Sequence, residues 1–405
     1  MNERTKRILL IIGFIVSIIL IGLALYFLFF KAELTTPPST QVEQPISGLQ
    51  PGEISPPTPF EPGVQRRPLS EASPVAKGGL TQIETVIETQ TSNIALSGSG
   101  NGVNFYNNED GRFYTIDQSG NIKSLSDKTF PQAKDVEWNK DSNKAIIEFP
   151  DGSNVVFNFD TQKQTTLPKH FEDFQFSPVK DEFIAKSMAL DPSNRWLVTS
   201  NDDGSGTKAF QALGTKANRV TVNWSPNDQV VAFSDTGYPL TGGLDRKMIV
   251  PIGKNQENFK GLVVEGLGFE SKWTPGGKQL LYSVHSDYSD LKPLLWFSDA
   301  APNTMGNNRK SIPLNTWVDK CTISSNTDAY CAVPVNLPPN AGLQRRLFED
   351  YPDRLYHVDL KTGAISILAI PEQDTTMTSL QVTNDGSALY YINKETNKLE
   401  SIRLK

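Results

Sequence analysis

A short pattern that recurs through most of the chain constrains its fold more than any other feature of the sequence. Each copy begins with an aromatic or aliphatic residue and a small polar residue, and a proline often comes next. A turn and then an apolar strand follow. The clearest copies begin at Phe176, Trp224 and Trp273, and looser ones begin at Trp138, Ile323 and Val382. Successive copies are 38, 48, 49, 50 and 59 residues apart. A period of about 40–50 residues with strand and turn composition predicts the blades of a β-propeller.

The blade count requires one more unit at the front. Four short β-branched or aromatic runs between residues 94 and 125 supply it, which makes seven. The last unit has only three strands, at 379–383, 388–392 and 398–404. Because an open ring would leave unpaired edges, we expect the alternating segment Thr81–Glu88 to supply the missing outer strand. The predicted fold class is therefore all-β, a seven-bladed β-propeller, with six or eight blades as alternatives.

The three clearest copies resemble one known type of repeat. Trp224-Ser225-Pro226-Asn227-Asp228, Trp273-Thr274-Pro275-Gly276-Gly277 and Phe176-Ser177-Pro178 are similar to the inner-hairpin turn of TolB-type and WD40-like propeller repeats. The resemblance covers roughly residues 90–405. It implies a propeller fold, and it leaves the function open, because that family includes partner-binding subunits and the lids of peptidases.

The N-terminal 30 residues predict a membrane anchor. Residues 8–30 carry no charge, and as a helix they would span ~34 Å, enough for a hydrocarbon core of ~30 Å. Arg4, Lys6 and Arg7 lie in the short tail 1–7, so the positive-inside rule predicts a cytoplasmic N-terminus. Since no small-residue cleavage site follows Phe30, we expect an uncleaved, single-pass signal anchor in the cell membrane.

The next segment, 31–79, predicts a disordered, proline-rich linker. Ten prolines fall between residues 35 and 79, and Phe60 is the only aromatic residue there. Such a composition cannot bury enough apolar surface to offset the entropy lost on ordering. The linker would act as a stalk, with a proline-rich docking ligand as the alternative, and the propeller would occupy residues 80–405 outside the cytoplasm.

Charge and metal-ligand content exclude some classes of function. The net charge is -6, and it becomes -8 without residues 1–30, which argues against nucleic acid as a partner. Three distant histidines and two cysteines form no metal-binding spacing, so we expect neither a metal nor another cofactor. The charge and anchor pattern suit a bacterial cell envelope.

Long loops on one face of the predicted ring are the best place for a binding site. The connections between the second and third strands are long at 236–245, 285–293 and 336–353, and short in the first two units. The candidate binding residues on these loops are Tyr238, His285, Tyr288, Arg345, Arg346 and Tyr351. Leu343 and Leu347 suggest a short amphipathic helix there. The alternative is that these side chains only pack the loops against each other.

Cys321 and Cys331 flank a predicted hairpin turn centred on Asn326. If they face each other across the two strands, a disulfide could form and persist outside the cytoplasm; two buried thiols are the alternative.

The leading functional hypothesis is a non-catalytic module that binds a protein or an envelope glycan. One alternative is a surface hydrolase or lyase acting on polysaccharide at the propeller face, and another is a structural subunit of a larger envelope assembly. No catalytic residues are predicted: no GxSxG sequence is present, and a carboxylate pair that converges from several blades has no characteristic spacing.

Overall fold

The computed structural model describes residues 16, 17, 19–21, 71–241 and 245–405. The chain divides into two compact units, Met1–Arg66 and Arg67–Lys405. Most of the expected anchor (8–30) and the linker up to residue 70 lie outside the described residues. Within the described part of the chain, no helix has the length and apolar character needed to cross a membrane. The anchor, its orientation and the stalk therefore stay predictions.

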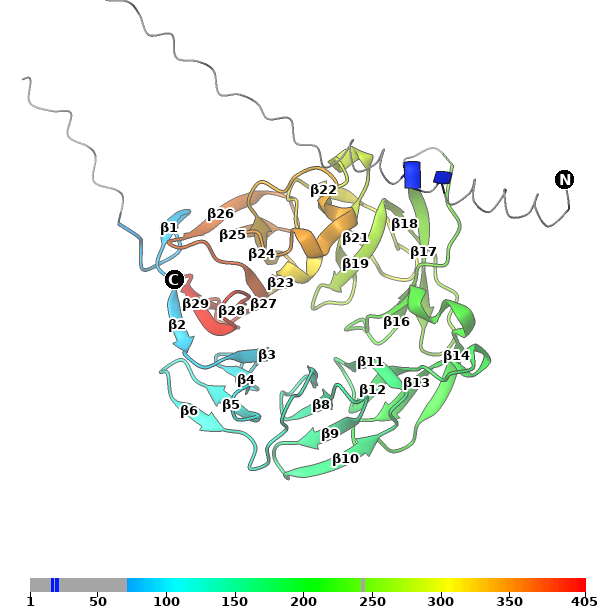
Figure 1. Ribbon diagram of the computed structural model, residues 1–405, viewed down its shortest axis with the longest axis horizontal. Helices are drawn as coiled ribbons and strands as arrows, with labels where there is room; N and C mark the ends of the chain where they lie inside the picture. The colour runs from blue at the N-terminus through cyan, green and yellow to red at the C-terminus, as the bar shows by residue number, and fades with distance from the viewer. Residues whose placement is uncertain (1–15, 18, 22–70, 242–244) are drawn as a thin grey trace, which may run out of the picture. The chain divides into compact units, whose positions relative to one another are not determined.

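Seven sheets follow one another around a ring, so the prediction of an all-β, seven-bladed propeller is confirmed (Figure 1). Blades 1–3 contain the strands β3 (Thr91–Leu96), β4 (Val103–Asn107), β5 (Arg112–Ile116), β6 (Ile122–Ser124), β7 (Asp135–Trp138), β8 (Lys144–Glu148), β9 (Asn154–Asn158), β10 (Lys163–Leu167), β11 (Phe171–Phe176), β12 (Glu182–Ser187), β13 (Trp196–Asn201) and β14 (Lys208–Ala212). Each of these blades has four strands, and its first strand lies nearest the centre of the ring.

Blades 4–7 repeat this plan. Their strands are β15 (Val220–Val222), β16 (Val230–Ser234), β17 (Arg246–Gly253), β18 (Leu262–Glu265), β19 (Leu267–Trp273), β20 (Gln279–His285), β21 (Pro293–Asp299), β22 (Lys310–Ile312), β23 (Cys321–Ile323), β24 (Asp328–Pro334), β25 (Asp353–Asp359), β26 (Ile365–Pro371), β27 (Met377–Val382), β28 (Ala388–Asn393) and β29 (Lys398–Arg403). Because neighbouring strands are antiparallel, the loops between second and third strands share one face with the connections between blades. We call this the upper face, and the opposite one the lower face.

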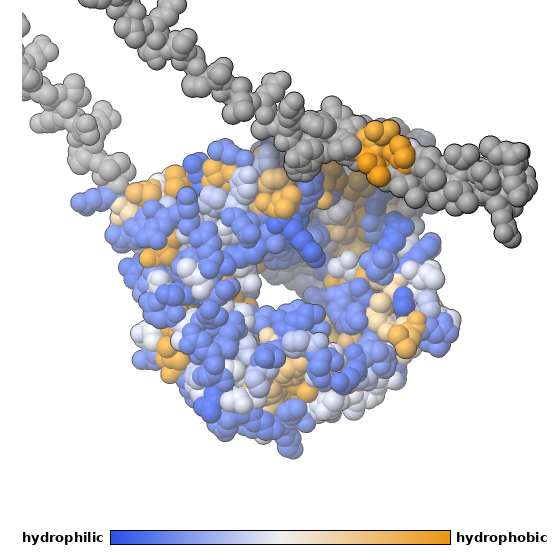
Figure 2. Space-filling view, viewed as in Figure 1, coloured by the Kyte–Doolittle hydropathy of each residue, from blue (hydrophilic) through white to orange (hydrophobic). Residues whose placement is uncertain are grey.

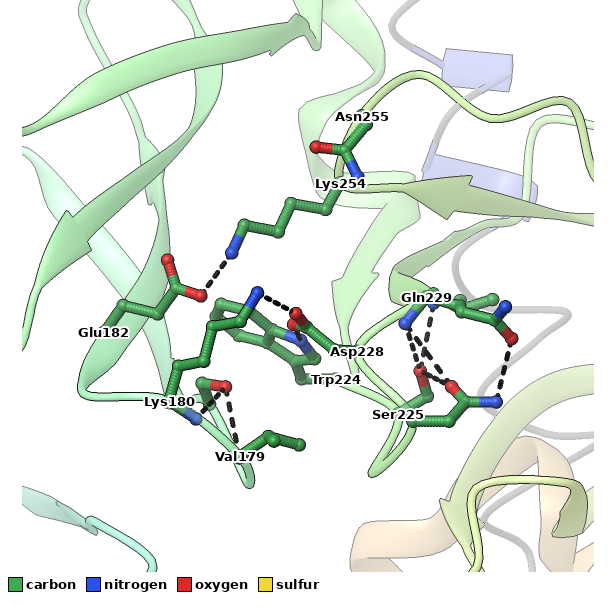
Figure 3. Close-up of polar contacts among 12 residues, drawn as sticks. Val179, Lys180, Glu182, Trp224, Ser225, Asp228, Gln229, Lys254 and Asn255 are labelled. Carbon is green, nitrogen blue, oxygen red and sulfur yellow. Dashed lines mark hydrogen bonds and ion pairs between the residues drawn. The ribbon is translucent and has the colours of Figure 1, made fainter.

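The recurring sequence pattern forms the tight turn between the first two strands of a blade. In blade 4 the Ser225 hydroxyl accepts hydrogen bonds from the amides of Gln229 (3.2 Å) and Val230 (3.0 Å). The indole of Trp224 donates to Asp228 at 2.9 Å, and Asp228 has a left-handed backbone with φ of 59° (Figure 3). The pattern therefore encodes a self-contained turn, which explains why it marks blades in the sequence.

Polar contacts tie each blade to the next. Between blades 3 and 4, Lys180 pairs with Asp228 and Lys254 pairs with Glu182 (Figure 3). In other blades the tryptophan of the pattern makes the link, because the Trp273 indole donates to the backbone oxygen of Asn223, in the preceding blade, at 3.2 Å. Apolar clusters fill the spaces between the sheets, and stacking therefore supplies most of the stability of the ring.

The segment before blade 1 closes the ring. β2 (Glu84–Ile87) pairs antiparallel with β29 and forms the outer strand of blade 7, as expected for residues 81–88. β1 (Gly79–Thr81) was not predicted, and it pairs parallel with β26 as a fifth strand of blade 6. The buried Ala76 also donates its amide to the Arg403 oxygen at 2.8 Å. The ordered ring thus begins earlier than residue 80, because a short segment can dock on an existing sheet edge although it contains Pro74.

The first hairpin of blade 6 carries the two cysteines. Cys321 on β23 lies opposite Cys331 on β24, with 4.0 Å between the Cα atoms, and a disulfide joins them. Both residues are fully buried, so the bond lies inside the packed core between blades 5 and 6.

Replacing Ile87 by alanine should weaken the closure of the ring. Ile87 on β2 is buried in a cluster shared by blades 7 and 1, and deleting a buried isoleucine side chain to alanine costs about 3 kcal/mol. Denaturant unfolding of the full chain should show this loss. Ile122→Ala is the control, since Ile122 is 54% exposed and its loss should change the free energy of unfolding by less than about 0.5 kcal/mol. Equal unfolding midpoints for the two variants would contradict a role of β2 in closure.

Candidate functional site

The loops of the upper face differ in length around the ring. The loops between second and third strands are short in blades 1 and 2, whereas those in blades 4, 5 and 6 run over 235–245, 286–292 and 335–352. Two backbone hydrogen bonds of 2.8 Å, from Asn340 to Asp290 and from Gly342 to Leu291, join the blade 5 and blade 6 loops. These two loops therefore form one continuous surface.

The blade 6 loop is shaped by its own small core. Trp317, Leu337 and Ala341 are buried together, and Phe348 and Tyr351 pack against them. The loop contains η5 (Ala341–Leu347), a 3₁₀ helix that is interrupted at Gln344. The expectation of an amphipathic helix that buries Leu343 and Leu347 is therefore wrong. Ala341 and Phe348 make the contacts with the loop core, and Leu343 and Leu347 stay 53% and 66% exposed.

Arg345 fixes this loop across the mouth of the central channel. Its guanidinium pairs with Glu270 on β19 (3.2 Å) and with Asp319. It also lies 3.5 Å from Glu349 and 5.1 Å from the ring of Trp317. Burial disfavours the charge, yet the three carboxylates hold the pKa of Arg345 above its usual value. The charge of this arginine is thus satisfied within the protein.

One lysine extends the ion-pair network, and a second forms a separate buried pair. Lys394, on the short loop of blade 7, pairs with Glu349 (2.9 Å) and Asp350 (2.7 Å). Lys320 and Asp353 form a buried pair at 2.7 Å, and burial raises the pKa of Asp353 to about 6. The network joins blades 5, 6 and 7 at the upper face.

A cavity of about 350 Å³ opens at the upper end of the channel. Its lining comes from the innermost strands and loops of blades 1, 2, 5, 6 and 7, and its charged residues are Asp135, Lys272, Asp319, Lys320, Arg345, Glu349 and Lys394. Figure 2 shows the central opening of the ring within a mostly hydrophilic surface. Lys272 donates to the backbone oxygens of Cys321 (2.6 Å) and Asp319 (3.2 Å), and burial lowers its pKa.

The predicted binding residues do not form one cluster. Of the six, only Arg345 lines this cavity. The His285 ring lies against Gly268 and Gly342, and burial lowers its pKa despite the nearby Asp245. Tyr351 stacks edge-on against Phe348, with ring centroids 5.8 Å apart.

Tyr238, Tyr288 and Arg346 lie on the surface instead. Tyr238 is 66% exposed and Tyr288 is 73% exposed. Arg346 is exposed as well, and it makes no ion pair with any described residue. A direct binding role for the six residues stays a prediction.

The channel residues were missed because their positions become meaningful only in the ring. One signal was present in the sequence: the residue before the first position of each repeat is polar in all six copies, and these residues are Glu137, Gln175, Asn223, Lys272, Thr322 and Gln381. Since the first strands converge at the centre, such positions line or approach the channel. Four of them (Gln175, Asn223, Thr322 and Gln381) lie with Lys272 in a second cavity of about 610 Å³.

Acidic residues gather on the first two strands of blade 2 and the first strand of blade 3. Burial, reinforced by the Asp135 carboxylate, raises the pKa of Glu137 to about 8. Burial and Asp135 also raise the pKa of Glu148 to about 7. Lys186 offsets part of this negative charge by pairing with Asp173 at 2.8 Å. Across the residues that the structure describes, no three acidic, histidine or cysteine side chains are arranged to hold a metal ion.

Comparison with known proteins supports the fold. No family model and no curated protein matches the sequence. Among solved structures, the chain is similar to an oligogalacturonate lyase from Vibrio parahaemolyticus, with a TM-score of 0.53 and 10% identity over 80% of this chain and 91% of that one. It is also similar to the β-propeller domain of Myceliophteria thermophila Cps50 (Swd1), with a TM-score of 0.51 and 10% identity over 80% and 100%. At such low identity these similarities establish a propeller fold and no shared function.

Replacing Glu137 by glutamine should stabilise the protein at high pH. The pKa of this carboxyl group rises from 4.5 to about 8 on folding, so between these pH values the native state keeps a proton that the unfolded state releases. The stabilisation that this proton gives to the native state is complete below pH 4.5 and is lost as the pH rises through 8. Glutamine does not titrate, so the melting temperature of the variant minus that of the wild type should increase between pH 5 and pH 8. Glu395→Gln, at an exposed position, is the charge control. A difference that does not change with pH would show that Glu137 is not desolvated.

Proposed function

We propose that this chain is a membrane-tethered, extracytoplasmic propeller that binds a protein or envelope-glycan partner through its upper face, without catalysis. The anchor at 8–30 and the proline-rich linker would hold the ring outside the cytoplasm. The long loops of blades 4–6 and the neighbouring second-to-third-strand loop of blade 3, at 188–195, would form the contact surface.

The distribution of exposed apolar side chains carries this proposal. Among the described residues of the ring, six large apolar or tyrosine side chains are more than half exposed: Ile122, Leu190, Tyr238, Tyr288, Leu343 and Leu347. All but Ile122 lie on second-to-third-strand loops of blades 3–6. Exposed apolar side chains that gather on one face of a soluble domain mark interaction sites, and tyrosine is favoured at binding hot spots.

The electrostatics of the channel support binding over turnover. Arg345, Lys394 and Lys320 are each paired with carboxylates of the protein itself. Charged groups that already neutralise each other favour a rigid loop platform, because a substrate would first have to break these pairs.

An enzyme is the second candidate, and one observation favours it. Glu137 and Glu148, with pKa values raised to about 8 and about 7, are the kind of perturbed acids found in catalytic sites. Solved structures of similar fold include an oligogalacturonate lyase and a streptogramin B lyase, at 10% identity each. Turnover of an acidic polysaccharide by the wild type, lost in Glu137→Gln, would establish this alternative and overturn the non-catalytic proposal.

Capture from envelope fractions tests the binding face. The full chain, purified in detergent, should retain a specific partner, and the triple variant Tyr238→Ala/Tyr288→Ala/Leu347→Ala should bind it at least tenfold more weakly. Binding can be quantified by surface plasmon resonance of the captured component.

The matched control replaces exposed apolar residues elsewhere on the ring. Ile122→Ala/Val179→Ala removes side chains that are 54% and 46% exposed and lie outside the upper-face loops. It should bind like the wild type. Equal loss of binding in both variants, or in neither, would contradict the assignment of the upper face.

The state of the cysteines tests the location outside the cytoplasm. Structural disulfides persist in oxidising compartments and are rare in the cytoplasm. Protein taken from cells directly into denaturant with iodoacetamide should therefore carry no label at Cys321 and Cys331 until a reductant is added, as measured by mass spectrometry. Full labelling without reductant would contradict an extracytoplasmic ring.

A further inference from the structure

The exposed apolar side chains of the upper face are accompanied by negative charge. Leu190 is followed by Asp191, Tyr288 lies between Asp287 and Asp290, and Asp245 ends the blade 4 loop that carries Tyr238. All four aspartates are exposed, and none forms an ion pair with another described residue. We call these four aspartates with Leu190, Tyr238, Tyr288, Leu343 and Leu347 the acidic-apolar face.

Most basic groups near this face are already occupied. Arg345 is bound by Glu270, Asp319 and Glu349. Lys394 is bound by Glu349 and Asp350. The Arg195 guanidinium donates to the backbone oxygens of its own loop, at Ala189 (2.9 Å) and Leu190 (3.5 Å).

The bases of these loops that form no ion pair with a described residue are Arg195, Lys292 and Arg346, against four aspartates. The side chains that a partner would meet therefore combine apolar groups with one more unpaired carboxylate than unpaired cations.

The loops that carry this face in blades 4–6 adjoin one another. The Asp245 carboxylate is close enough to His285 to act on its pKa. The blade 6 loop is hydrogen-bonded to the blade 5 loop at Asp290 and Leu291. A single extended partner can therefore contact apolar and acidic groups from several blades at once.

We infer that the partner of this face is a protein segment that is both basic and amphipathic, with lysine or arginine beside large apolar side chains. This inference rests on the proposed function and specifies its partner. Opposite charge steers association and suppresses wrong partners, whereas anionic envelope polymers and anionic lipid surfaces would meet like charge. Apolar side chains of the segment would cover the exposed leucines and tyrosines, and its cations would lie over the four aspartates.

Defined peptides test the inference with the full chain in neutral detergent. The probes are an amphipathic peptide of about 18 residues built from lysine and leucine, its glutamate-leucine counterpart, and polygalacturonate as an anionic glycan. The lysine-leucine peptide should bind, with a dissociation constant that increases on going from low to high salt. Binding of the glutamate-leucine peptide or of polygalacturonate with equal or higher affinity would overturn the inference.

Two charge variants separate specific from general attraction. Asp245→Asn/Asp287→Asn/Asp290→Asn should weaken binding of the lysine-leucine peptide about tenfold, the result expected if each exposed pair contributes modestly. The control Asp141→Asn/Asp160→Asn/Asp203→Asn removes the same charge from exposed positions in lower-face turns and should leave the affinity unchanged. Equal weakening by both would reveal only general attraction to an acidic protein and would overturn the inference.

The two proposals can fail separately. If Tyr238→Ala/Tyr288→Ala/Leu347→Ala abolishes capture of an envelope partner while the lysine-leucine peptide does not bind, the upper face is a binding surface and its partner is not basic. If neither the partner nor the peptide depends on the upper face, both proposals are wrong.

Discussion

Pairing between the two ends of the propeller sequence holds the ring together. β2 and β29 are joined across a long stretch of chain, and next to them Lys398 pairs with Glu88, 310 positions earlier. Loop-closure entropy grows only with the logarithm of loop length, at about 0.6 kcal/mol for each doubling, so this long closure costs little more than a short one. In return it completes blade 7 with a fourth strand and buries Ile87 between blades 7 and 1. With the ring closed, each of the seven blades packs against a neighbour on both sides.

A closed ring of similar blades allows its loops to differ. The sheets are fixed by the turns of the repeat and by contacts between blades, and neither depends on the upper-face loops. Blade 6 carries 18 loop residues at 335–352, whereas blade 1 turns within four at 108–111. The long loop has its own core around Trp317 and is held by Arg345, so it acts as a rigid platform. Such a platform can present exposed side chains without a large entropic cost on binding.

The fold could be read from the sequence because its signals are local. The turn after Trp224 is closed by two local hydrogen bonds, from the Trp224 indole to Asp228 and from the Val230 amide to the Ser225 hydroxyl. Because all of these residues are close in sequence, the pattern itself marks a blade. The closing strand was predictable from alternation and from the need to pair an edge. β1 was not, because its pairing with β26 depends on an available sheet edge and not on its own composition.

The candidate site was harder to predict because its contacts are long-range. Arg345 was identified from its loop, but its partners Glu270 and Asp319 are 75 and 26 residues away. Tyr351 and His285 were chosen for chemistry that favours binding, yet they pack within loops, since nothing in a sequence separates an exposed tyrosine from a buried one. Exposure, which singled out Leu190 and Leu347, is a property of the folded ring alone.

The arrangement of charge is the reason why we propose binding. At the channel mouth Arg345, Lys320 and Lys394 are each paired with carboxylates of the protein, so this network gains little from an outside ion. On the outer loops the same chain leaves aspartates unmatched beside apolar side chains, where a partner can neutralise them at low desolvation cost. Under the proposed tether the local concentration of the ring at the membrane is fixed, so modest affinity at such a face is enough for recognition.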